Sequence, residues 1–88
     1  MTYRISWESD AFHMLQRIWD EHDDATELTR ALDEVYELLV EDAERKGESR
    51  ARGRRILIAP PLGILFQVQQ RLSEVVIVRV WCYRTRNG

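Results

Sequence analysis

The sequence has 88 residues, of which 44% are hydrophobic and 32% are charged, and its formal net charge is −2. A chain of this length makes one domain with a thin core, so we expect a single domain over residues 1–88. The only cysteine, Cys82, excludes a disulfide framework, and no apolar run is long enough to cross a bilayer. The N-terminus lacks the pattern of a signal peptide, and we therefore expect a cytoplasmic protein with no membrane partner.

The small net charge hides a strong asymmetry between the two halves of the chain. Residues 1–48 contain 5 Lys/Arg and 14 Asp/Glu, a net charge of −9, whereas residues 49–88 contain 8 Arg and the single acid Glu74, a net charge of +7. All the cations of the second half are arginines, which suit bidentate recognition of phosphate or carboxylate groups. The C-terminal half is therefore expected to carry the surface that binds an anionic partner.

The first two elements are a strand and an amphipathic helix. Residues 2–7 predict a strand, because Tyr3, Ile5 and Trp7 alternate with polar residues. A helix is then predicted from Ser9 or Asp10 to about residue 20. Its apolar stripe is formed by Phe12, Leu15, Ile18 and Trp19.

A second, longer helix is predicted over residues 25–46. Asp23 or Asp24 is a suitable N-cap, Glu27 follows Asp24 by three residues as in a capping box, and Gly47 is a suitable stop. Its apolar stripe is formed by Leu28, Ala31, Leu32, Val35, Leu38 and Leu39. Because only a short polar break separates the two helices, they are expected to form an antiparallel hairpin.

The C-terminal half predicts a flexible linker over residues 47–53 followed by strands. These strands are expected over residues 54–59, 64–69 and 74–83, with turns at 60–63 and 70–73. The resulting order is β-α-α-β-β-β. We therefore predict an α+β fold in which the helical hairpin packs on one face of a small, antiparallel-rich sheet and leaves the other face open.

Alternation along the last strand assigns its side chains to the two faces of the sheet. The core side is expected to hold Val76, Val78, Val80 and Cys82. The open side is expected to hold Val75, Ile77, Arg79, Trp81 and Tyr83. Arginine together with tryptophan and tyrosine on an open, basic face predicts a surface that recognises RNA or protein.

Three stretches carry a resemblance to a known family. They are YRISW at residues 3–7 followed by Ala-Phe-x-x-Leu, GRRILIAPPLGILFQV at residues 53–68, and VVIVRVW at residues 75–81. With the order of the elements and the length, they resemble the RelE/ParE superfamily of bacterial type II toxins. RelE-like members cut mRNA in the ribosomal A site with arginines, lysines and often a tyrosine, whereas ParE-like members poison DNA gyrase with the same fold.

The resemblance implies roles for the basic residues of the C-terminal half. The implied catalytic residues are Arg54, Arg55, Tyr83 and Arg84. The implied RNA- or antitoxin-binding residues are Arg50, Arg52, Arg79, Trp81 and Arg86. The resemblance also implies an acidic cognate antitoxin as partner, with the ribosome and its mRNA or DNA gyrase as target. Without it, Arg50, Arg52, Arg54 and Arg55 favour an anion-binding edge over a solvated loop. Arg79, Tyr83, Arg84 and Arg86 are equally consistent with phosphate positioning and with an edge strand protected by charge.

The expected function is that of a RelE-like toxin that acts on mRNA at the ribosome as an endoribonuclease. Gly63 stands where active members carry an arginine, and no helix is predicted after residue 83. The alternatives are therefore a ParE-like gyrase inhibitor or a catalytically inactive binding protein with the toxin fold. No cofactor or metal is expected, because His13 and His22 do not share a helical face and the C-terminal half has no histidine.

Overall fold

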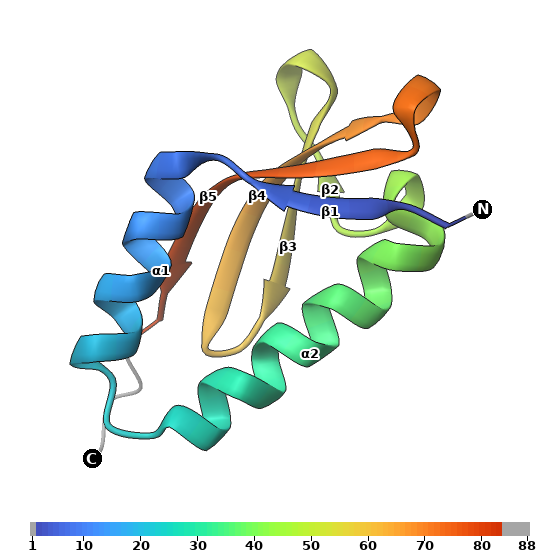
Figure 1. Ribbon diagram of the computed structural model, residues 1–88. Helices are drawn as coiled ribbons and strands as arrows, with labels where there is room; N and C mark the ends of the chain where they lie inside the picture. Colours follow the sequence, from blue (N-terminus) through green and yellow to red (C-terminus); the bar gives the residue numbers. More distant parts are fainter. Residues whose placement is uncertain (1, 84–88) are drawn as a thin grey trace.

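The computed structural model describes residues 2–83 and shows two helices packed on a mixed five-stranded sheet (Figure 1). The elements are β1 (Arg4–Trp7), α1 (Ser9–Glu21), α2 (Ala25–Asp42), β2 (Glu48–Ser49), β3 (Arg54–Ala59), β4 (Leu62–Gln69) and β5 (Glu74–Cys82). The strand order is β1-β5-β4-β3-β2, with β1 parallel to β5 and the other pairs antiparallel. This arrangement confirms the predicted α+β fold and the antiparallel-rich sheet.

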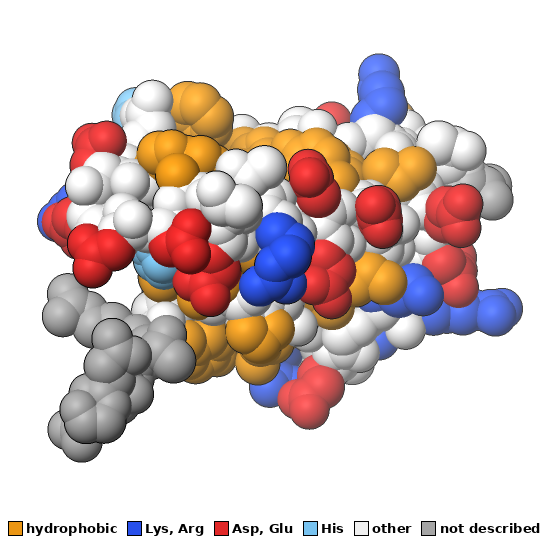
Figure 2. Space-filling view, turned by 90° about the horizontal axis from the view of Figure 1, so that it is seen from below, with side chains coloured by type: hydrophobic (Ala, Val, Ile, Leu, Met, Phe, Trp, Pro, Cys, Tyr) orange, Lys and Arg blue, Asp and Glu red, His pale blue; other side chains and the backbone are white. Residues whose placement is uncertain are grey.

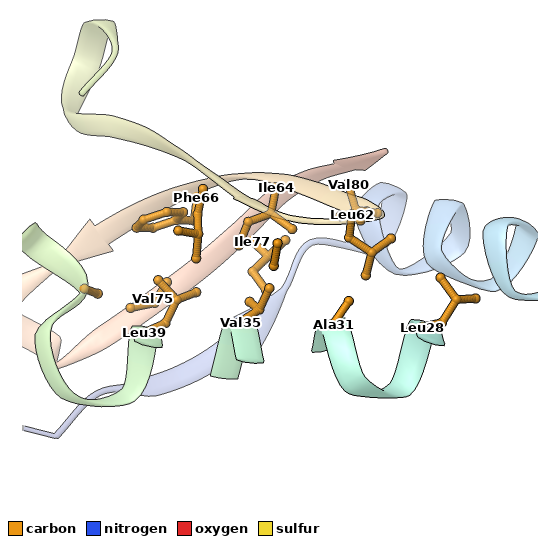
Figure 3. Close-up of a cluster of buried hydrophobic side chains, with 14 of the residues drawn as sticks. Leu28, Ala31, Val35, Leu39, Leu62, Ile64, Phe66, Val75, Ile77 and Val80 are labelled. Carbon is orange, nitrogen blue, oxygen red and sulfur yellow. The ribbon is translucent and has the colours of Figure 1, made fainter. Parts of the chain in front are cut away.

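The core lies between α2 and the middle strands of the sheet. Four residues of the predicted α2 stripe are fully buried, and they are Leu28, Ala31, Val35 and Leu39. They face buried side chains of β4 and β5 (Figure 3), namely Leu62, Ile64, Phe66, Val75 and Ile77. Of the two N-cap candidates, Asp24 caps the helix, because its Oδ1 accepts a hydrogen bond from the backbone N–H of Glu27 at 3.1 Å. Within residues 2–83, neither helix has the length and apolar character needed to cross a membrane.

The segment before β3 was wrongly predicted to be a flexible linker. Residues 48 and 49 form the edge strand β2, which pairs with Ile56 and Arg55 of β3, and a 3₁₀ turn follows at Ala51–Gly53. The left-handed conformation of Gly47 has a structural reason, since a Cβ there would lie 2.1 Å from the carbonyl oxygen of Ile56. A two-residue strand leaves no periodic pattern in a sequence, so composition alone suggested a linker.

The faces of β5 were predicted correctly in its second half and wrongly in its first half. Val80 is buried and Cys82 packs against the core, but Val75 and Ile77 are fully buried as well. The register explains this change of parity. Leu65 pairs with Arg79 whereas Phe66 pairs with Ile77, so Val78 is an extra residue at a β-bulge. One inserted residue exchanges the two faces of a strand, and strict alternation cannot anticipate it.

The apolar stripe of α1 is also narrower than predicted. Ile18 is buried and Leu15 packs against the core, and the residue that completes this face is the buried Ala11. Phe12 and Trp19, which the pattern assigned to the core, expose 47% and 37% of their surface. They lie about 60–100° around the helix from the centre of the buried face, on one flank of α1.

Tyr3 joins β1 to the turn that follows α2. The buried Tyr3 donates a hydrogen bond from its hydroxyl to Oε2 of Glu44 at 2.5 Å. The hydrogen bond to Glu44, reinforced by burial, raises the pKa of Tyr3 above its ordinary value of 10.0. The same hydrogen bond, which favours the ionised carboxylate, lowers the pKa of Glu44 below its ordinary value of 4.5.

These shifts predict a pH dependence of stability. Because the pKa of Glu44 is lower in the folded state, its contribution is present above pH 4.5 and is lost as the pH falls through the folded-state pKa. The contribution of Tyr3, with its raised pKa, is present below pH 10.0 and is lost at higher pH. In thermal melts between pH 7 and pH 3, Tyr3→Phe is expected to lose less Tm than the wild type. Equal losses in both proteins would contradict this coupling, and Tyr83→Phe is the control.

Candidate functional site

Three arginines meet at one end of the sheet. Arg54, at the start of β3, pairs with Gln67 of β4, just before the turn that carries Arg71. Arg54, Arg55 and Arg71 consequently line one cavity of about 250 Å³. Its other walls are formed by Glu44, Ser49, Gly53, Val68 and Gln70. The cavity has the size and the donors for one phosphate or carboxylate group, although Glu44 brings a negative charge to its wall.

The two adjacent arginines of β3 differ in what they contact. Arg55 lies opposite Phe66, on the helix side of the sheet, and its guanidinium donates to the carbonyl of Lys46 at 2.6 Å and of Gly47 at 3.0 Å. Arg55 thus holds the segment that follows α2 against β3. Arg54 points to the opposite face, because successive residues of a strand alternate. Of the two, Arg54 is the better placed to receive an external anion.

The remaining arginines of the 50–55 cluster lie in the exposed loop between β2 and β3. Arg50 pairs with Glu48 through an Nη2–Oε1 distance of 3.0 Å. Arg52 has a left-handed backbone, with φ of 65°, and is exposed. Both lie at the same end of the molecule as Arg54 and Arg71.

Arg71 is a candidate site residue that the sequence did not predict, because residues 70–73 were interpreted only as a turn. The register of β3 and β4 brings Arg71 close to Arg54.

Tyr83 lies at the other end of the sheet. Its backbone N–H donates to the carbonyl of Pro61 at 2.7 Å, beside the turn between β3 and β4. Val76, the β5 residue level with Arg54, is seven residues away from it. Because one of the seven is the bulge residue Val78, the rise is about six residues, or roughly 20 Å at about 3.3 Å each. Arg54 and Tyr83 therefore lie at opposite ends of the sheet, and the catalytic and RNA-binding roles implied for these residues stay a prediction. Arg84 and Arg86 lie outside the described residues.

Trp81 covers the position of the missing third-strand arginine. Gly63 and Trp81 are directly paired across β4 and β5, and a Cβ built on Gly63 would lie 2.4 Å from Cε2 of the indole. The indole therefore lies over the backbone of Gly63. Its other neighbour is Tyr83, whose ring stands edge-on at a centroid distance of 6.4 Å. The space that an arginine would need at position 63 is filled by tryptophan.

The open face of the sheet is less basic than predicted. By register, Ile56, Leu65 and Val76 lie on it beside Arg54 and Arg79. Ile58, on the same face, is 51% exposed. The face is thus aliphatic over most of β3 and β4, and Arg79 and Trp81 are the members of the predicted binding set on its β5 side. The other described arginines of the set gather at the end that holds the cavity.

A second, larger hollow lies at the turn between the helices. It has a volume of about 750 Å³, and Trp81 and Tyr83 form one wall. The opposite wall is acidic and contains Glu21, Asp23, Asp24 and Glu27. His22 is held there by Glu27 at 3.3 Å and by the backbone N–H of Asp24 at 3.0 Å. These carboxylates disfavour a phosphate beside Tyr83.

Within residues 2–83, no group of three or more His, Cys, Asp or Glu side chains is placed to hold a metal ion.

The protein is a small α+β domain. Its two helices cover one face of a mixed five-stranded sheet, and arginines gather at one end of that sheet. No protein-family model and no curated protein matches the sequence. Solved structures do match. The RelBE2 toxin–antitoxin complex from Mycobacterium tuberculosis gives a TM-score of 0.76 at 18% identity over 93% of this chain and 92% of that chain.

Two further structures agree with this match. A chromosomal ParDE toxin–antitoxin system from P. aeruginosa gives a TM-score of 0.73 at 22% identity, covering 94% of this chain and 98% of that one. The archaeal RelE–RelB complex from Pyrococcus horikoshii gives 0.64 at 14% identity, covering 98% and 100%. The chain therefore has the RelE/ParE toxin fold, as its sequence predicted.

Proposed function

We propose that this protein is the toxin of a type II toxin–antitoxin module and that it acts by binding its target, as a ParE-like inhibitor of DNA gyrase, rather than by cutting mRNA. The likeness in fold to RelBE and ParDE complexes supports the first part. One observation carries the second part. The indole of Trp81 lies against Gly63, the position at which the resemblance implies an arginine in members that cut RNA.

The chemistry of the described residues agrees with a binding function. RNA cleavage needs a group that moves a proton and cations that stabilise the developing charge at the same phosphate. Here the cavity of Arg54 and Arg71 is far along the sheet from Tyr83, and acidic side chains surround the only described histidine near Tyr83. A toxin that inhibits by binding requires neither a proton-transfer group nor cations gathered at one phosphate.

A RelE-like, ribosome-dependent endoribonuclease is the second candidate. The cavity lined by Arg54, Arg55 and Arg71 favours it, because the guanidinium groups of Arg54 and Arg71 could hold an mRNA phosphate. The ribosome would then position the RNA, and such positioning can supply roughly 7–11 kcal/mol of a barrier.

Both candidates require an antitoxin. The partner that complements the basic end and the aliphatic open face is an acidic protein with an amphipathic segment. Induced expression of the chain alone is expected to arrest growth, and co-expression of a small acidic protein encoded beside its gene is expected to restore it. Normal growth with abundant, folded, soluble protein would contradict the toxin assignment.

A further inference from the structure

The exposed aromatic side chains of the two helices lie on corresponding flanks. In α1, Phe12, Leu15 and Trp19 follow one another at three- and four-residue spacing, and in α2 Leu32 and Tyr36 do the same. Together with Trp7 we call these six residues the interhelical strip. Leu15, Leu32 and Trp7 rest on the core, whereas Phe12, Trp19 and the 38% exposed Tyr36 present their rings to solvent.

Trp7 connects the two flanks of the strip. It is the last residue of β1, just before α1 begins, and its indole Nε1 donates to the hydroxyl of Tyr36 on α2 at 2.7 Å. In Figure 1, α1 and α2 diverge from their connecting turn and β1 crosses the open end between them. The hydrogen bond of Trp7 fixes Tyr36 beside the start of α1, and the rings of Phe12, Trp19 and Tyr36 remain exposed on the facing flanks of the helices.

The surroundings of the strip are acidic. Glu8 lies one helical turn before Phe12, and Asp33 and Glu37 lie beside Tyr36, all three exposed. Figure 2 shows acidic side chains on this side of the molecule, with hydrophobic side chains beside them and a Lys or Arg side chain among them. Arg30 lines the same hollow as Asp33, Glu34 and Glu37, so the carboxylates outnumber the cations there. An apolar strip with an acidic rim attracts a partner that combines apolar and basic side chains, and it repels an acidic antitoxin.

We propose that the interhelical strip is the surface with which this toxin docks on a basic amphipathic segment of its target protein. This inference rests on the proposed function. The apolar side chains of that segment cover Phe12, Trp19 and Tyr36, while its lysines or arginines face Asp33 and Glu37. The toxin then uses two surfaces of opposite charge, the basic end for the antitoxin and the acidic helix side for the target.

The test measures binding of purified wild-type protein and variants to purified DNA gyrase and to purified ribosomes. Phe12→Ser combined with Trp19→Ser is expected to weaken binding at least about 10-fold, since aromatic anchors dominate interfaces. The matched control combines Met14→Ser, on the opposite flank of α1, with Leu72→Ser in the turn before β5. These residues are 40% and 58% exposed, and their variants are expected to bind within about 2-fold of wild type.

A second pair of variants tests the charge of the rim. Asp33→Lys with Glu37→Lys is expected to weaken binding several-fold more than Glu34→Lys with Glu41→Lys, which changes the net charge equally on the far flank of α2. The difference should shrink at high salt. Unchanged binding of the Phe12 and Trp19 double variant would overturn the proposal. The proposal would also be overturned if wild-type protein sedimented as a dimer and the double variant as a monomer, because the strip would then bind a second copy of the chain. Wild-type protein that does not bind gyrase would instead overturn the proposed function, whether or not it binds ribosomes. If it binds neither probe, the docking role is overturned as well.

Discussion

Leu39→Ala is expected to lower the free energy of unfolding by about 2–5 kcal/mol. Leu39 is fully buried near the C-terminal end of α2, in the same cluster as Phe66 and Val75 (Figure 3). Removing three carbons there takes away apolar contact and leaves a cavity that the helix and the sheet cannot both close. In a domain of this length, such a loss is a large share of the total stability.

Urea or guanidinium melts measure this loss directly. Leu72→Ala is the matched control, because Leu72 is 58% exposed and its truncation should cost less than about 0.5 kcal/mol. Leu32→Ala should fall between the two, since Leu32 is only partly buried. A loss below about 0.5 kcal/mol for Leu39→Ala would show that the α2 stripe does not form the core.

Gly63→Ala is expected to destabilise the protein by about 1–3 kcal/mol through its clash with Trp81. In most strands the same change would be favourable, because glycine has the greater conformational entropy to lose. Here the added Cβ would lie 2.4 Å from Cε2 and 2.5 Å from Nε1 of the indole. The indole must swing away, which also disturbs its edge-on contact with Tyr83.

A double-mutant cycle isolates this clash. In a Trp81→Val background, Gly63→Ala is expected to be neutral or stabilising, so that the two changes couple by about 1 kcal/mol or more. Additive effects of the two substitutions would mean that Trp81 does not rest on Gly63. The space at position 63 would then remain open to an arginine, and the main observation against RNA cleavage would be lost.

The sequence predicted the parts of the fold that rest on long periodic patterns. The α2 stripe and the strands β1, β3 and β4 were found close to their expected positions. The errors arose where one inserted residue, or the pairing of a short strand, determines the local structure. The bulge at Val78 exchanged the faces of the first half of β5, and the two-residue strand β2 was too short to produce a pattern.

The candidate site was predicted less well than the fold. The sequence identified Arg54 and Arg55 as neighbours, but their opposite faces and the bonds of Arg55 to two carbonyl oxygens depend on tertiary structure. Arg71 joins Arg54 only through the register of β3 and β4, and Tyr83 is separated from them by that same register. Distances across a sheet are not encoded in the spacing of residues along the chain.

The most direct test of a binding toxin is a pair of assays on the purified wild-type protein. One is primer extension on mRNA in a translating-ribosome extract, and the other is supercoiling by purified DNA gyrase. We expect no new mRNA ends in the first assay and inhibited supercoiling in the second. Cleavage of mRNA in the ribosomal A site with unimpaired supercoiling would contradict the account. It would show that Arg54 and Arg71 suffice, with the ribosome, for an enzyme in which tryptophan covers the place of the usual arginine.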